Sequence, residues 1–204
     1  MRLIGMLDSP YTRRVAISLK FLNVPFEHEP VSVFSQYDSF AATNPVVKAP
    51  TFVTDSGCVL MDSSLILEYA ERVATEDRSL TPREFREFER SQRIIGLALA
   101  ATDKAVQLVY ERSLRPQEKQ HLPWSDRVKR QLTSACRLLE NEITSAEGWL
   151  VAIRPMQADV TTAVAWSFMQ SLVPDAVPAG DYPRLCEFTA RAEALPEFRS
   201  TPMN

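Results

Sequence analysis

The stretch SPYTRRV, residues 9–15, follows a short apolar run at residues 2–6 and begins a segment in which apolar residues recur at helical spacing. A strand that leads through a tight turn into a helix is the first half of a βαβ unit. A hydroxyl at the first turn of a helix lies where free backbone N–H groups and the positive end of the helix dipole favour an anion. We therefore expect a strand, a helix at residues 12–23 and an anion site between them.

A second informative stretch, APT at residues 49–51, lies about forty residues later and precedes a short β-branched and aromatic run. Proline has no N–H group, so it suits the first residue of a strand and leaves neighbouring backbone groups free for a ligand. Together the two stretches indicate a site for a small, anionic, peptide-like ligand.

The remaining signals before residue 74 complete a small α/β domain. Residues 26–33 alternate as a second strand, and residues 35–43 form a polar, short helical or irregular connection. Two short apolar runs, 51–53 and 59–61, flank a glycine-containing loop and predict a hairpin. The residues DSS, 62–64, then cap a helix. The order β-α-β-(α)-β-β-α predicts a parallel first half and an antiparallel closing hairpin.

Beyond a polar linker at residues 74–82 the pattern is helical throughout. The expected helices cover residues 83–113, 124–145, 158–172 and 182–194. The sequence thus predicts an α/β domain at residues 1–75 followed by an all-α domain at residues 83–204.

Composition excludes several classes of protein. The chain has 204 residues, of which 45% are hydrophobic and 24% charged, as in ordinary globular proteins. The net charge of −3 and the lack of a basic stripe argue against nucleic-acid binding. No apolar run approaches the length of a membrane span, and no secretory signal is evident, so we expect a cytoplasmic protein without a membrane partner.

The cysteines and histidines indicate neither disulfides nor a metal. Cys58, Cys136 and Cys186 are an odd number and far apart, which favours a reducing compartment. His28 and His121 have no cysteine or second histidine at metal-site spacing, so we expect no metal site.

Four motifs follow one another along nearly the whole chain. They are SPYTRRV at residues 9–15, NPVVKAP at 44–50, the pair Asp62-Ser63 at a helix start, and Ala158-Asp159 before a buried helix. In this order and spacing they resemble the cytosolic glutathione S-transferase superfamily, in its bacterial, serine-type form. The chain departs from that pattern at Met156, where the family usually has a Ser or Thr helix cap.

The resemblance implies a thioredoxin-like βαβ-ββα first domain, followed by an all-helical domain that lines the site of a hydrophobic electrophile. Glutathione would be the substrate or cosubstrate, and the protein would be a homodimer. Ser9 would be the catalytic residue and would stabilise the glutathione thiolate. The Ala49 backbone would pair with the cysteinyl group, and Lys48 would bind the glycyl carboxylate. Asp62 would hold the γ-glutamyl ammonium, and Ser63 the α-carboxylate.

The energetics of thiol ionisation are consistent with this role for Ser9. A free thiol with a pKa near 8.5 is only about 3% thiolate at pH 7. A shift of about two units, or about 2.7 kcal/mol, makes it mostly thiolate. One charge-assisted hydrogen bond supplies roughly 1.5–3 kcal/mol, and a helix N-terminus adds roughly 0.3–1 kcal/mol.

Each assignment has an alternative. Ser9 could be a plain helix cap, with Tyr11 as the rival hydroxyl, and Asp62 and Ser63 could simply cap their helix. Pro50 could be trans, because only about 5–6% of X–Pro bonds in folded proteins are cis. Lys48 could be a solvated lysine. Arg13 and Arg14 could be solvated helix charges, or Arg13 could help to hold an anion near the thiol, and solvation is the expectation for both.

Three functions remain open at this stage. The leading one is addition of glutathione to an electrophilic small molecule. Glutathione could instead be regenerated, as in isomerisation or dehalogenation, or the fold could serve as a non-catalytic binding module. In a dimer, Asp103 of the 83–113 helix could reach the γ-glutamyl ammonium bound by the other subunit.

Overall fold

The computed structural model describes residues 1–144 and 148–203, so the expected helix end at Ser145 lies outside the described residues. The chain divides into two compact units. The first contains Met1–Thr81 together with Ala194–Asn204, and the second contains Pro82–Glu193. The predicted second domain ran to residue 204, whereas the structure groups the last eleven residues with the first unit. Among the described residues, no helix is long and apolar enough to cross a membrane.

A four-stranded sheet in the order β2-β1-β3-β4 forms the centre of the first unit. The strands are short: β1 Arg2–Ile4, β2 Glu27–Glu29, β3 Thr51–Val53 and β4 Val59–Met61. Strand β1 pairs with β2 in parallel, and the β1–β3 and β3–β4 pairs are antiparallel. The predicted parallel unit and antiparallel hairpin are therefore confirmed.

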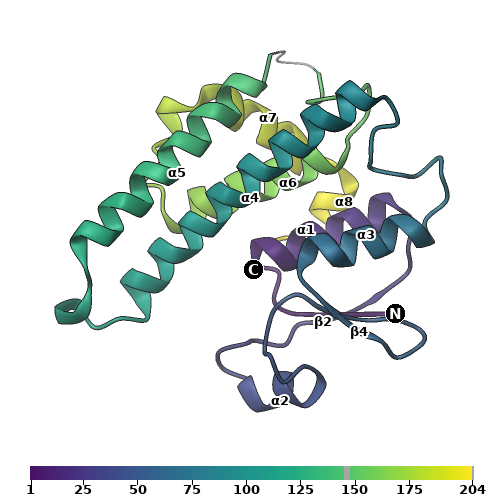
Figure 1. Cartoon of the computed structure of the whole chain (residues 1–204), viewed down its shortest axis with the longest axis horizontal. Coiled ribbons are helices and arrows are strands. Elements are labelled where there is room, and N and C mark those ends of the chain that lie inside the picture. Colours follow the sequence, from purple (N-terminus) through teal and green to yellow (C-terminus); the bar gives the residue numbers. More distant parts are fainter. Residues whose placement is uncertain (145–147, 204) are drawn as a thin grey trace. The chain divides into compact units, whose positions relative to one another are not determined.

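Two helices cover one face of this sheet, and a third lies on the opposite side (Figure 1). Helix α1, Pro10–Phe21, packs beside α3, Ser63–Val73, whereas α2, Tyr37–Thr43, lies on the other side. A short helix, α8, Pro196–Arg199, also packs on α1. The apolar sides of α1 and α3 and the inward-facing strand residues form one core, which includes Leu3, Val15, Leu19, Phe52 and Ile66.

Helices alone build the described part of the second unit. They are α4 Phe85–Ser113, α5 Leu122–Glu142, α6 Gln157–Leu172 and α7 Pro183–Glu193, with 3-10 turns η1 Gln117–Lys119 and η2 Ala179–Asp181. Helix α4 packs along both α5 and α6, and α6 packs against α7. The predicted fold class, a thioredoxin-like α/β unit plus an all-helical unit, is confirmed.

Helix α6 is buried along most of its length, and a carboxylate caps it from inside. Asp159 is 1% exposed, and its oxygens accept hydrogen bonds from the backbone N–H groups of Met156 and Leu150, both at 2.8 Å. The Met156 side chain makes no capping bond. Asp159 therefore caps α6 and ties down the preceding loop without a Ser or Thr at the cap.

Candidate functional site

The first part of the candidate site is the start of α1. Ser9 is the N-cap residue, and its Oγ accepts a long hydrogen bond of 3.4 Å from the Thr12 N–H. Pro10 occupies the first helical position, where its missing N–H costs nothing. The Ser9 side chain is partly exposed, so its hydroxyl combines a helix cap with access from outside.

The second part is the loop between α2 and β3, which buried polar side chains hold in place. Asn44 is 4% exposed; its amide nitrogen donates to Thr51 Oγ1 at 2.8 Å, and its amide oxygen accepts from the Val46 N–H at 3.1 Å. The Thr51 hydroxyl donates in turn to the Lys48 carbonyl at 2.8 Å. Val47 adopts a positive φ of 51°, which is unusual for a β-branched residue. Residues held in such conformations cluster at functional sites.

This loop leads into Ala49 and Pro50, and the bond between them is cis. The resemblance implied that isomer, and the structure contains it. No described residue forms a hydrogen bond with the Ala49 N–H or C=O. A peptide-like ligand laid along this edge would therefore find both backbone groups of Ala49 available.

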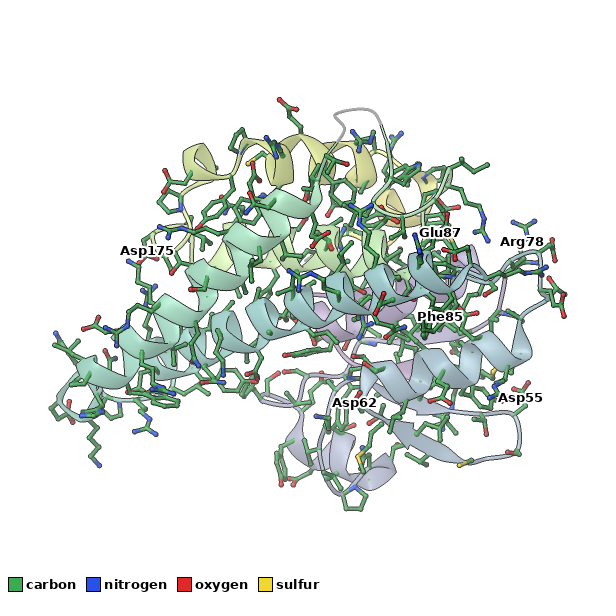
Figure 2. The ribbon with its side chains drawn as sticks, turned by 45° about the horizontal axis from the view of Figure 1, so that its top comes forward. Asp55, Asp62, Arg78, Phe85, Glu87 and Asp175 are labelled. Atoms are coloured by element: carbon green, nitrogen blue, oxygen red, sulfur yellow. The ribbon has the colours of Figure 1, made fainter. Side chains whose placement is uncertain are left out.

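The third part is the start of α3. Asp62 is the N-cap residue with a φ of 71°, and its Oδ1 accepts from the Ser64 N–H at 2.9 Å. Ser63, the first helical residue, is 4% exposed, and no described residue accepts a hydrogen bond from its N–H. The positive end of α3 thus retains a donor for an anion. Figure 2 shows Asp62 at this helix start.

Arg14 joins the two helix starts from within the protein. It is 3% exposed, and its Nη1 donates to Ser63 Oγ at 3.0 Å and to Ser64 Oγ at 3.2 Å. Its Nε is buried without a hydrogen-bond partner among the described residues. Burial lowers the pKa of Arg14 to about 10, against the opposing influence of the nearby Asp62 carboxylate. The guanidinium therefore remains charged at neutral pH and adds positive potential at the start of α3.

Gly5 brings the first two parts of the site into contact. Its φ is +140°, and a Cβ at this position would lie 2.7 Å from Thr12 Oγ1 and 3.2 Å from the Ala49 Cβ. The first turn of α1 and the Ala49 loop therefore approach closely on either side of Gly5. A side chain here would push them apart.

Lys48 and Asp62 connect the loop to α3. Lys48 Nζ lies 4.0 Å from Asp62 Oδ2, and each side chain is half exposed. An exposed ion pair of this kind contributes at most about 1 kcal/mol to stability. Lys48 and Asp62 can therefore separate at low cost and pair with charged groups of a ligand. The structure thus brings all five predicted site residues into one neighbourhood, formed by Ser9, Lys48, Ala49, Asp62 and Ser63.

The sequence-based expectation for the two arginines of α1 was wrong. Arg13 and Arg14 were expected in solvent, but each is only 3% exposed. Helical positions 13 and 14 cannot share one face, so each arginine is buried by a different partner: α3 for Arg14 and the end of the chain for Arg13. The sequence of α1 does not indicate that either arginine is buried, because both partners come from distant parts of the chain.

A metal site was not expected from the sequence. Within residues 1–144 and 148–203 there is no group of three or more His, Cys, Asp or Glu side chains that could hold a metal ion.

Asp103 was expected to reach the other subunit of a dimer. In α4 of the second unit it already accepts hydrogen bonds from Lys104 Nζ at 3.0 Å and Gln107 Nε2 at 2.8 Å.

Comparison with known proteins identifies the family. A family model described as the glutathione S-transferase N-terminal domain matches residues 3–78. An uncharacterised GST-like protein of Escherichia coli K12, YibF, is 31% identical over 151 residues, which cover 74% of this chain and 70% of YibF. The chain belongs to the glutathione S-transferase family.

Solved glutathione S-transferase structures share the fold over almost the whole length. One from Methylobacterium radiotolerans, crystallised with glutathione sulfonate, has a TM-score of 0.90 at 24% identity and covers 98% of this chain and 93% of its own. A glutathione transferase family member from Pseudomonas fluorescens Pf-5, with bound glutathione, has a TM-score of 0.86 at 25% identity and covers 100% of this chain and 98% of its own.

Proposed function

We propose that this glutathione S-transferase family member binds glutathione in its first unit and transfers it to a hydrophobic electrophile, with Ser9 stabilising the thiolate. The observation that carries the proposal is the convergence of two helix N-termini and the Ala49 loop within one unit. These three parts offer separate partners for a thiol, a peptide backbone and a charged α-amino acid end. The two solved structures described above, one with glutathione sulfonate and one with glutathione, support the choice of ligand.

Ser9 can cap its helix and bind a thiolate at the same time. A serine hydroxyl has one donor hydrogen and two acceptor lone pairs. The bond from the Thr12 N–H uses one lone pair and leaves the hydrogen free for a thiolate sulfur. The positive end of α1 favours the same charge. Together these effects lower the pKa of a bound thiol without a neighbouring general base.

The start of α3 suits the γ-glutamyl end of glutathione. Its α-carboxylate would accept hydrogen bonds from the Ser63 N–H and hydroxyl, because the Ser63 oxygen already accepts from Arg14 and its hydrogen remains available. Its ammonium would pair with Asp62 Oδ2, which faces Lys48 across 4.0 Å. Lys48 would then turn to the glycyl carboxylate at the other end of the tripeptide. Bound glutathione would thus separate Lys48 from Asp62, and the weak ion pair between them would be replaced by one ion pair at each end of the tripeptide.

Calorimetry with glutathione tests the ligand directly. We expect one binding site per chain, with a dissociation constant below millimolar. In a matched titration, the variant Asp62→Asn should bind glutathione more weakly, because the γ-glutamyl ammonium loses the carboxylate that it pairs with. Absence of heat at millimolar glutathione would refute the proposal.

Turnover of a generic chloronitroaromatic with glutathione tests the transferase step. Stoichiometric loss of free thiol with formation of the thioether supports conjugation. Glutathione that is bound but never consumed would contradict transfer and leave a binding role.

We further propose that the protein works as a homodimer in the cytoplasm, with the first unit of one subunit against α4 of the other. The family membership supports this arrangement. Phe85, in the first turn of α4, is 73% exposed and is an apolar surface that a second subunit would cover.

A further inference from the structure

Arg13 is buried against the last residues of the chain. It is 3% exposed, and its Nε donates to the Thr201 carbonyl at 2.8 Å. Its guanidinium carbon lies 5.8 Å from the centre of the Phe198 ring. A cation placed under an aromatic face and bonded to a backbone carbonyl is stabilised by both contacts. Both partners belong to residues 195–201, which we call the C-terminal anchor.

The C-terminal anchor is itself a closed, well-packed piece of structure. Phe198 is 1% exposed and meets Phe21 in a T-shaped contact at 6.5 Å. The Thr201 hydroxyl donates to the Glu197 carbonyl at 2.8 Å, which fixes the backbone that presents the Thr201 oxygen to Arg13. The Phe198 ring therefore contacts two side chains of α1, Arg13 and Phe21, whose positions lie eight residues or about two helical turns apart.

The contact bears on Ser9 because Arg13 lies in the first turn of α1, directly after the Ser9 cap. The Arg13 N–H donates to the Ser9 carbonyl at 2.9 Å, which closes that turn. The Ser9 cap bond is long, at 3.4 Å, and the turn contains no acidic residue to favour the helix dipole. Helix ends fray unless they are held by caps or by packing. Pro10, Thr12 and Arg14 are buried at this turn as well, and the Arg13 side chain is the contact that ties the turn to the end of the chain.

We propose that the C-terminal anchor is a positioning element for Ser9, holding Arg13 so that the first turn of α1 stays closed. Its effect on chemistry rests on the proposed function of Ser9. A thiolate bond depends on the Ser9 hydroxyl lying within a few tenths of an ångström of its place, and a displacement of about 1 Å can cost about a hundredfold in rate. Lys48, Ala49, Asp62 and Ser63 lie on other elements. Loss of the anchor should therefore affect the thiol far more than overall ligand affinity.

Hydrogen–deuterium exchange without ligand tests the structural half. Arg13→Lys keeps the charge but removes the Nε donor, and Phe198→Leu keeps most of the volume but removes the ring. In both variants we expect the amide N–H groups of residues 12–14 to exchange about tenfold faster, while the sheet and α3 are unchanged. Arg199→Lys is the matched control, because Arg199 lies in the same short helix and is exposed.

The pKa of the bound thiol, measured by thiolate absorbance, tests the chemical half. We expect it to rise by about one unit in Arg13→Lys and Phe198→Leu, a change of up to about tenfold in thiolate fraction. Glutathione affinity should change less than about threefold, and Arg199→Lys should match the wild type. If the two variants leave exchange at residues 12–14 unchanged, or raise it uniformly across the unit, the proposal that the anchor positions Ser9 is refuted. An unchanged thiol pKa would refute it as well. If the wild type binds no glutathione but the exchange result is as expected, the proposed function is refuted. The claim that the anchor keeps the first turn of α1 closed would then still be supported.

Discussion

At the scale of single residues, the Ser9 hydroxyl has to satisfy a helix and a ligand together. The long bond from the Thr12 N–H occupies one lone pair and leaves the donor hydrogen unused. We predict that Ser9→Ala raises the pKa of bound glutathione by about one to two units, because one charge-assisted hydrogen bond is lost. Turnover at neutral pH should fall about tenfold or more, since the thiolate fraction falls with it.

A pH titration of thiolate absorbance, together with calorimetry, checks this prediction. The affinity for glutathione should change little, because the uncharged thiol gains less from Ser9 than the thiolate does. Tyr11→Phe is the matched control and should leave the thiol pKa unchanged. If Ser9→Ala leaves the pKa unchanged and Tyr11→Phe raises it, the tyrosine is the thiolate partner.

Arg14 shows what a buried charge does beside a helix start. Arg14→Met removes the donor to the Ser63 and Ser64 hydroxyls and the positive potential at α3. We predict that the dissociation constant for glutathione rises about tenfold, equivalent to about 1.4 kcal/mol, while the thiol pKa stays within a few tenths of the wild-type value. Calorimetry and the thiolate titration measure the two quantities separately. Equal affinity in wild type and variant would show that Arg14 serves packing alone.

At the scale of elements, Asp159 makes helix α6 sensitive to pH. Burial raises the pKa of this carboxyl from 3.8 to about 6, although three backbone hydrogen bonds and Arg191 favour the charged form. The folded state therefore holds the proton more tightly than the unfolded state. The contribution of Asp159 to the free energy of unfolding is largest below about pH 4 and falls as pH rises through 6.

Urea unfolding of the wild type and Asp159→Asn across pH 4.5–7 tests this sign. The difference in free energy of unfolding, wild type minus variant, should decrease by on the order of 2 kcal/mol as pH rises through that window. Asp181→Asn, an exposed acid in η2, is the control and should leave the pH profile parallel to the wild type. A difference that is constant with pH would contradict burial as the dominant influence on Asp159.

Periodicity predicted the longer elements because a buried face repeats in the sequence. It placed the start of α1 at Thr12, whereas the helix begins at Pro10, since a proline suits the first helical position after a serine cap. It placed the last helix at residues 182–194 and predicted none beyond it, whereas a further helix, α8, begins at Pro196. Four residues are too few to show a period, so α8 and its contact with Arg13 could not be predicted from the sequence.

The candidate site was predictable in kind and not in detail. Ordered motifs predicted Ser9, Ala49 and the Asp62-Ser63 pair, because each lies at the end of an element where backbone groups are free. The buried contacts behind them, Arg14 to Ser63 and Arg13 to Thr201, join residues 49 and 188 positions apart. Contacts of that range are set by packing and leave no local pattern.

At the scale of the whole molecule, the exposed start of α4 needs an explanation. Phe85 is 73% exposed beside charged neighbours, and Figure 2 shows it together with Glu87 on the same helix. A large exposed apolar side chain is often covered by a partner. We predict a homodimer in which Phe85 is buried between subunits, so light scattering of the wild type should give twice the mass of one chain.

The variant Phe85→Glu tests which surface forms that dimer. A carboxylate buried without a partner is strongly unfavourable, so we expect the dimer dissociation constant to rise at least about a hundredfold, or about 2.7 kcal/mol. Glu87→Gln is the control, since it also changes the charge by one unit but lies about 200° around the helix from Phe85. A wild type with the mass of one chain would refute the dimer. A Phe85→Glu protein that remains as dimeric as Glu87→Gln would place the interface elsewhere on the molecule.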